Sequence, residues 1–246
     1  MSPTLLLVAH GSRDPRFGDT ARRVRDAVAQ RLPHVEVRLS YLGLDEPTVA
    51  DSISSVDGEL VIVPLLLAPG YHSEIDLPRI VAAESTPAAV VITDVIGQAS
   101  LTSALADRLA QAGPGDSDGI LVTAVGSSNP AAALVVRRRA IELSTRLHRP
   151  VDVVFATQLG QDEIKLRGAL RRLSAAGAHR IALSPYFLSA GLLIERVEEA
   201  LDRLAPGALV AGPLGAHPHV VVAILDRYRT ALPRLRSGDL TAEQRT

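Results

Sequence analysis

The chain alternates between short apolar runs and longer amphipathic stretches. The apolar runs have the length of β-strands and lie at residues 5–9, 35–39, 60–67, 90–95, 120–124, 151–156, 181–188 and 209–211. Apolar positions with helical spacing predict helices at residues 21–32, 48–56, 78–83, 131–146, 162–176, 193–204 and 219–232. Strands that alternate with helices are typical of a parallel sheet covered by helices. We therefore predict an α/β fold with two similar halves, each a parallel sheet flanked by helices.

The second half of the chain repeats the first. Residues 7–15 read Leu-Val-Ala-His-Gly-Ser-Arg-Asp-Pro and align with residues 122–130, which read Val-Thr-Ala-Val-Gly-Ser-Ser-Asn-Pro. Residues 63–74 align in the same way with residues 184–195 through a shared Pro, Gly and Glu. The residues that shape turns are therefore kept in both copies, as expected for a duplicated unit.

The junction between the copies is short and polar. Gly, Pro and Asp residues interrupt both periodicities between residues 111 and 119. We therefore predict an N-terminal domain at residues 1–112 and a C-terminal domain at residues 119–246.

Two histidines distinguish the copies. His10 and His72 each follow a predicted strand, but Val125 and Leu193 stand at the aligned positions of the second half. Ligands of parallel α/β sheets bind outside the carboxyl ends of the strands. Neutral imidazole binds divalent transition metals and accepts protons near neutral pH. We therefore expect the metal and catalytic site in the N-terminal half, and a degenerate site in the other.

Composition narrows the class of protein. The 246 residues carry a net charge of −1, so nothing attracts the chain generally to nucleic acid or to an anionic membrane. The absence of cysteine excludes disulfides, thiolate metal sites and thiol nucleophiles. No apolar run approaches the ~20 residues of a membrane span, and the first residues do not resemble a signal peptide. We expect a cytoplasmic protein that binds neither nucleic acid nor membrane.

Two motifs resemble a known family. They are His10-Gly11-Ser12-Arg13 at the first strand tip, and Pro64 through Gly70-Tyr71-His72 followed by Asp76-Leu77-Pro78. With the duplication, they make the chain similar to two-domain members of the sirohydrochlorin chelatase family, the class II chelatases, which insert iron or cobalt into sirohydrochlorin. The resemblance implies two halves that face each other across a cleft, and a monomer with an internal pseudo-dimer.

The resemblance also implies roles for the histidines. His10 and His72 match the positions that hold the metal and help to remove the pyrrole protons. The metal is a substrate, Fe²⁺, Co²⁺ or Ni²⁺, and no organic cofactor is implied. Some relatives supply an acidic ligand from the tip of the second strand, where this chain has Gly43. We expect two protein ligands plus water or substrate, with Glu46 as the first carboxylate in reserve, ahead of Asp45 and Glu74.

Sirohydrochlorin carries several carboxylates, which require cations or hydrogen-bond donors. Arginine binds carboxylate with both arms of its fork, so Arg13 and Arg79 are candidates for binding this substrate. Ser12 is a third, although a hydroxyl at this position also caps helices, and Ser127 repeats it. Arg13 is equally compatible with a solvated surface residue.

Three alternatives stay open. A metallochaperone or tetrapyrrole-binding protein without turnover would use the same two histidines, whereas a periplasmic metal-binding protein would require a signal peptide. A phosphoryl-transfer enzyme would require a glycine-rich phosphate loop, and no such motif follows any predicted strand. His217 and His219 could share a metal, but their position favours a loop and a helix cap.

Overall fold

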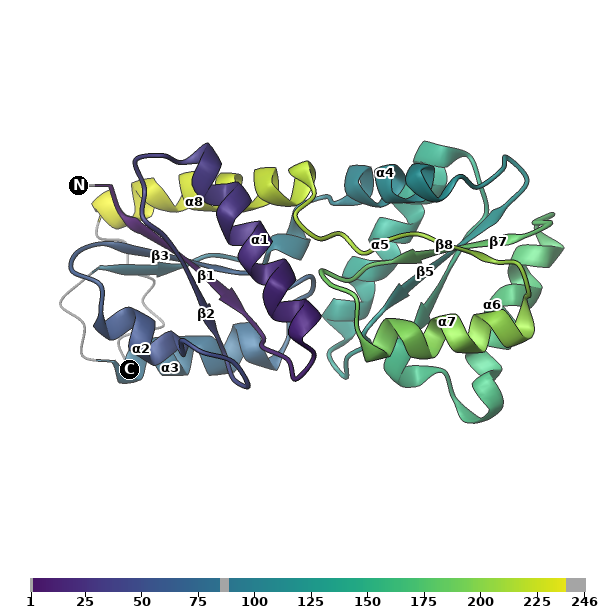
Figure 1. Cartoon of the computed structure of the whole chain (residues 1–246), viewed down its shortest axis with the longest axis horizontal. Coiled ribbons are helices and arrows are strands. Elements are labelled where there is room, and N and C mark those ends of the chain that lie inside the picture. Colours follow the sequence, from purple (N-terminus) through teal and green to yellow (C-terminus); the bar gives the residue numbers. More distant parts are fainter. Residues whose placement is uncertain (1, 85–88, 238–246) are drawn as a thin grey trace. The chain divides into compact units, whose positions relative to one another are not determined.

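The computed structural model describes residues 2–84 and 89–237 and divides into two compact units (Figure 1). The first unit consists of Met1–Ala99 and Pro218–Thr246, and the second of Ser100–His217. In the part of the chain that the structure describes, no helix is long and apolar enough to cross a membrane.

The first unit is built on a parallel sheet with the strand order β2-β1-β3-β4. Its strands are β1 (Thr4–Ala9), β2 (Val37–Tyr41), β3 (Leu60–Pro64) and β4 (Val90–Ile92). Its helices are α1 (Pro15–Arg31), α2 (Val49–Ser54), the π-helical turn η1 (His72–Asp76), α3 (Leu77–Ala83), the 3₁₀ turn η2 (Ile96–Gln98) and α8 (Pro218–Ser237).

Alternation along β1 buries side chains on both faces of this sheet. Leu6 and Val8 pack with the apolar residues of α2 and α3, while α1 and α8 cover the other face (Figure 1). Both faces of a parallel sheet are normally covered, which explains why its strands read as continuous apolar runs.

The second unit repeats this plan with the order β6-β5-β7-β8. Its strands are β5 (Gly119–Ala124), β6 (Val151–Phe155), β7 (Ile181–Pro185) and β8 (Leu209–Val210). Its helices are α4 (Thr102–Ala112), α5 (Pro130–Leu147), α6 (Ile164–Ala175) and α7 (Leu192–Leu204), with the 3₁₀ turns η3 (Ala156–Gln158) and η4 (Gln161–Glu163). The predicted α/β class, with a parallel sheet in each half, is confirmed.

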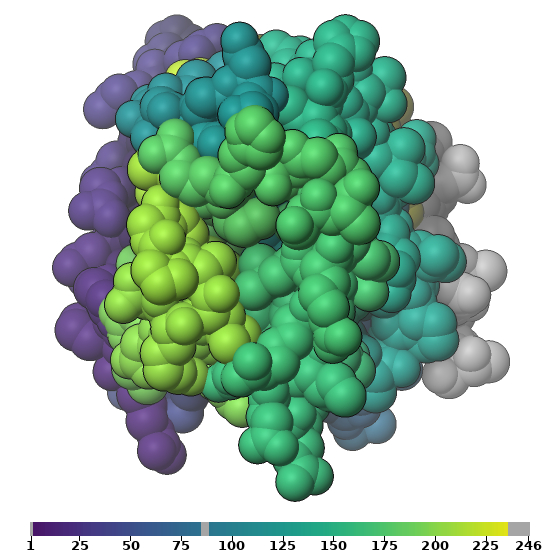
Figure 2. All heavy atoms as spheres, turned by 90° about the vertical axis from the view of Figure 1, so that its right-hand side faces the viewer, coloured from purple at the N-terminus to yellow at the C-terminus, as the bar shows by residue number. Residues whose placement is uncertain are grey.

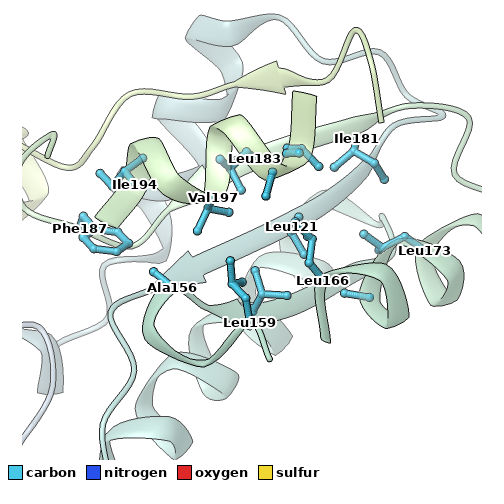
Figure 3. Packing of buried hydrophobic residues seen from close by; sticks show 14 residues of the cluster. Leu121, Ala156, Leu159, Leu166, Leu173, Ile181, Leu183, Phe187, Ile194 and Val197 are labelled. Carbon is cyan, nitrogen blue, oxygen red and sulfur yellow. The ribbon is translucent and has the colours of Figure 1, made fainter. Parts of the chain in front are cut away.

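One hydrophobic cluster of the second unit lies between its sheet and the helices α6 and α7. Leu121 and Leu183 of the sheet pack against Leu166 of α6 and Val197 of α7, and all four side chains are fully buried (Figure 3). Figure 2 faces this unit and shows the yellow-green segment before β8 beside the green segment before β7, in agreement with the pairing of these strands.

The compact units and the sequence repeats do not coincide, because each copy gives its last helix to the other unit. Helix α4 belongs to the first copy but packs on β7 and α5, whereas α8 of the second copy packs on β3 and α1. The helix at residues 102–112 is not among those predicted from the apolar spacing, although Gly113 ends α4 in the left-handed conformation that is common after helices.

A partly buried carboxylate connects α4 to α5 in the second unit. Glu142 of α5 accepts hydrogen bonds from the hydroxyls of Ser100 and Thr102 at the start of α4, and it pairs with Arg139. Burial raises the pKa of Glu142, but hydrogen bonds from the two hydroxyls and the charges of Arg139 and Arg138 outweigh it, so the pKa lies below its ordinary value.

Candidate active site

His10 and His72 lie side by side at the carboxyl edge of the first sheet. His10 directly follows β1, and His72 opens η1 in the segment after β3. Ligands of open α/β sheets bind where the strand order reverses, and in the order β2-β1-β3-β4 this point is between β1 and β3. The centroids of the two imidazole rings are 4.4 Å apart, with an interplanar angle of 81°. The structure therefore brings the two candidate ligands together.

The turn after β1 is held by backbone contacts. Gly11 has a φ of 89°, a conformation that side chains disfavour. A Cβ on Gly11 would lie 1.7 Å from the carbonyl oxygen of Gly43, so the two loops meet in backbone contact. The backbone N–H of Ser12 donates to Oδ2 of Asp45 at 2.8 Å. These contacts fix the position from which His10 projects.

The second unit keeps the same turn without the histidine. Gly126 has a φ of 95°. Oγ of Ser127 accepts a hydrogen bond from the N–H of Asn129 at 3.0 Å, just as Oγ of Ser12 accepts one from the N–H of Asp14 at 3.1 Å. The hydroxyl of Ser12 thus has a role in the turn that both copies share, and a contact with substrate would add to it.

Both histidine rings use Nδ1 for a hydrogen bond to oxygen. Nδ1 of His72 lies 2.8 Å from Oδ2 of Asp76, and Nδ1 of His10 lies 3.2 Å from the carbonyl oxygen of Gly11. A carbonyl or a carboxylate can only accept, so we assign the proton to Nδ1 in each ring. This tautomer leaves Nε2 with a lone pair, which is the form that binds a metal or accepts a proton.

The other candidate residues lie on three separate segments of the first unit. Arg13 follows the β1 turn, Arg79 is in α3, and Glu46 is in the loop after β2; all three are exposed. Among residues 2–84 and 89–237, no group of three or more His, Cys, Asp and Glu side chains is arranged to hold a metal. Glu46 is therefore not brought into a three-ligand site with His10 and His72.

The tip of β2 offers space but no carboxylate. A Cβ on Gly43 would have no atom within 4 Å, so this position is open. Among the acidic residues of this loop, Asp45 accepts a hydrogen bond from the backbone N–H of Ser12. Tyr41 at the end of β2 is buried, and this burial raises the pKa of its phenol, so it stays neutral near the site.

His217 and His219 belong to different units, because the boundary follows His217. The His217 side chain is buried in the second unit, with Nε2 at 3.4 Å from a carboxylate oxygen of Asp107 in α4. This contact attaches the segment after β8 to α4, in agreement with the loop interpretation.

Two features of the edge were missed by sequence reasoning. Three large apolar side chains are exposed, Leu44 at 65% in the loop after β2, and Tyr71 at 59% and Ile75 at 44% at the start of η1 and within it. The carboxylate of Asp76 contacts a candidate ligand directly. Asp76 stands four residues after His72, and this spacing inside a helical turn was the available signal.

The chain matches the family model described as CbiX over residues 4–112 and 119–231. It is 26% identical to the sirohydrochlorin ferrochelatase of Bacillus subtilis strain 168, over 93% of this chain and 92% of the relative. It is 25% identical to the sirohydrochlorin cobaltochelatase of Priestia megaterium, over 93% of this chain and 80% of the relative.

Solved structures share the fold. SirB from Bacillus subtilis with Fe³⁺ superposes with a TM-score of 0.76 at 23% identity, covering 96% of this chain and 98% of the other. The same comparison with SirB from Bacillus subtilis subspecies spizizenii in complex with cobalt gives a TM-score of 0.73 at 23% identity, with the same coverage. Because the family model matches both halves, the chain belongs to the CbiX family.

Proposed function

We propose that this chain is a metal chelatase that inserts Fe²⁺ or Co²⁺ into sirohydrochlorin, in the biosynthesis of siroheme or cobalamin. The observation that carries the proposal is the pair of imidazoles, 4.4 Å apart at the strand-order reversal, in only one of two repeated halves. The names of the relatives support the choice of substrate.

Metal insertion exchanges one divalent ion for two protons. The metal leaves its water and protein ligands for the four nitrogens of the macrocycle, and two pyrrole N–H groups lose their protons. Nε2 of His10 and Nε2 of His72 are able to hold the ion first and to accept protons afterwards. Two borderline nitrogen ligands without a thiolate or a third protein ligand bind an ion weakly enough to release it.

Exposed groups around the histidines suit a flat, multiply charged substrate. Leu44, Tyr71 and Ile75 offer apolar contact to the face of a macrocycle, and the Tyr71 ring lies 6.0 Å from that of His72. Arg13 and Arg79 supply cations for its carboxylates. The hydroxyl oxygen of Ser12 accepts a hydrogen bond from the backbone N–H of Asp14, so the hydroxyl keeps its own proton to donate to a carboxylate.

The chelatase function also implies where the site lies, which oligomeric state the enzyme has and where it acts. The site belongs to the N-terminal half, residues 1–112, and the duplicated half, residues 119–246, carries no equivalent pair. The enzyme acts as a monomer in the cytoplasm, without nucleic acid or membrane as a partner. Glu46 is the carboxylate that we propose as an additional metal ligand. It belongs to the same loop as Asp45, and that loop reaches the β1 turn through the hydrogen bond between Asp45 and Ser12.

The test is a turnover assay. Purified protein is mixed with sirohydrochlorin and Co²⁺ or Fe²⁺, and the absorbance change of the macrocycle is followed beyond one equivalent of product. We expect multiple turnovers, and a loss of about 100-fold or more in His10→Ala and in His72→Ala, the range typical of general base catalysis.

His34→Ala is the matched control, because His34 is an exposed histidine of the same unit that is remote in sequence from both strand tips. Product that stops at one equivalent would indicate a carrier without turnover. Near-normal rates in both histidine variants at limiting metal would refute the mechanism.

A further inference from the structure

Asp76 comes directly before α3, but its backbone is already helical (φ −62°, ψ −55°), so it does not have the extended conformation of a helix cap. It precedes Leu77-Pro78 at the start of α3, and it makes no side-chain hydrogen bond to the backbone of that helix. Oδ2 of Asp76 instead lies 2.8 Å from Nδ1 of His72. The carboxylate therefore serves the histidine and not the helix end.

The π-helical turn creates this contact. In η1 the N–H of Leu77 donates to the carbonyl of His72, five residues earlier, in place of the usual four. Leu77 is fully buried, so it anchors the helix in the core. The His72 and Asp76 side chains keep 43% and 32% of their surface exposed. The wide turn thus holds the pair outside the core without displacing the buried face of α3.

The second unit has neither the π-turn nor the pair of histidine and aspartate. Helix α7 begins at Leu192 as an ordinary α-helix, without a π-turn. Leu193 aligns with His72, and the residue four positions later is Val197, which is fully buried. The spacing from His72 to buried Leu77 is one residue longer than that from Leu193 to buried Val197. The extra residue, the acid and the imidazole therefore occur together in one copy and are absent together from the other.

We propose that Asp76 is a positioning residue that holds His72 as the Nδ1–H tautomer, with Nε2 free for the metal ion and for pyrrole protons. The role of Nε2 in metal insertion rests on the chelatase function proposed above. A carboxylate that receives Nδ1–H fixes the tautomer and the orientation of the ring. Without it, the proton can move to Nε2 and block that atom.

The first test is ¹⁵N NMR of histidine-labelled, metal-free protein. We expect His72 in the wild type to show a protonated Nδ1 and an unprotonated Nε2. Asp76→Ala is expected to give a mixture of tautomers, and Asp76→Asn an intermediate result because an amide both donates and accepts. Asp57→Ala, which changes an exposed aspartate of the same unit, is the control. An unchanged tautomer in Asp76→Ala would overturn the proposal.

The second test measures function. Asp76→Ala is expected to weaken Co²⁺ binding by about 10–100-fold, the usual effect of losing such a hydrogen-bonded partner. It is also expected to lower kcat more than it raises KM for sirohydrochlorin. In the His72→Ala background the same change should have no further effect, because Asp76 acts through His72. Additive losses, or normal Co²⁺ binding and kcat after loss of the tautomer, would overturn the proposal.

These measurements separate this inference from the function itself. If the wild type binds Co²⁺ but gives no turnover, the chelatase proposal fails, while the NMR and Co²⁺-binding results still decide the role of Asp76. Circular dichroism of each variant monitors folding. Since a third of the Asp76 side chain is exposed, we expect the variants to remain folded.

Discussion

The strand tips of the two units have the same backbone but different side chains. His10 and Val125 both follow a first strand and precede a glycine with positive φ, and both are exposed, Val125 to 45%. Val125 forms the turn as well as His10 does, so the fold does not require an imidazole there. The chemistry of the first unit is therefore separable from its architecture.

The helices after the third strands differ more deeply. In the first unit a π-turn and an acid accompany His72, whereas in the second a regular helix starts with Leu192, exposed to 74%. Here the backbone itself has changed with the side chains. The two copies are therefore alike where turns are built and unlike where the third strand meets its helix.

The largest expected effect comes from separating the copies at their sequence junction. A fragment of residues 1–112 lacks α8, in which Val220, Ile224, Leu225 and Tyr228 are almost fully buried. Four such side chains contribute about 6–12 kcal/mol, comparable with the whole stability of a domain. We expect this fragment to be unfolded by circular dichroism.

The control joins residues 2–99 to 218–237 through a flexible Gly/Ser linker, which restores the first unit. This chain is expected to fold cooperatively. A stable, monomeric 1–112 fragment would contradict the division into units that exchange helices.

The next largest effect is expected from the glycines of the two equivalent turns. Gly11→Ala places a methyl group against the backbone of Gly43 and a side chain at positive φ, which alone costs about 1–2 kcal/mol. We expect a lower melting temperature and at least about tenfold slower turnover, because His10 moves with its turn.

Gly126→Ala is the matched change in the second unit, where a Cβ would meet Oγ1 of Thr157 at 2.5 Å. It should lower the melting temperature and leave turnover intact. Equal losses of turnover in the two variants would show that catalysis does not depend on the first turn in particular.

A moderate, pH-dependent effect is expected at the start of β5. The hydrogen-bonded guanidinium of Arg180 lowers the pKa of the Asp118 carboxyl below its ordinary value, although burial opposes this. A lowered pKa in the folded state stabilises the protein above the ordinary carboxyl range, and this stabilisation is lost as the pH falls through the folded pKa. Asp118→Asn should therefore destabilise by about 1–3 kcal/mol at pH 7.

The difference between wild type and Asp118→Asn should shrink as the pH falls into the acid range, measured by urea denaturation at each pH. At the aligned position of the first unit, the carbonyl of Pro3 accepts a hydrogen bond from Tyr228 of α8. Tyr228→Phe should accordingly give a loss of stability that does not change between pH 7 and the acid range. A constant loss in Asp118→Asn would contradict the assignment.

The smallest effect is expected at the open tip of β2. Gly43→Glu adds a carboxylate where a side chain meets no atom within 4 Å, and we expect Co²⁺ to bind several-fold more tightly by equilibrium titration. Glu46→Gln tests the reserve ligand in parallel. A loss of Co²⁺ affinity in Glu46→Gln would show that the exposed loop of Glu46 closes on the metal. An unchanged Co²⁺ affinity in Gly43→Glu would show that the open position at Gly43 lies away from the metal.

The α/β class, the duplication and the two histidines that follow β1 and β3 could be read from the sequence alone. These features are local: apolar runs, glycine turns and residue identity are written in consecutive positions, and parallel strands end at one edge of the sheet. The helix at Thr102–Ala112 was not predicted from the sequence, although Leu105 and Leu109 lie four residues apart on its buried face.

Only the tertiary structure decided which helix completes which sheet and how the rings meet. The exchange of α4 and α8 depends on packing between segments that are distant along the chain, such as α8 against β3 and β4, and α4 against β7, and no local pattern encodes it. The 4.4 Å separation of His10 and His72 follows from the pairing of β1 with β3. The orientation of His72 depends on a π-turn, which arises because the core anchors Leu77 while one extra residue must be accommodated before it.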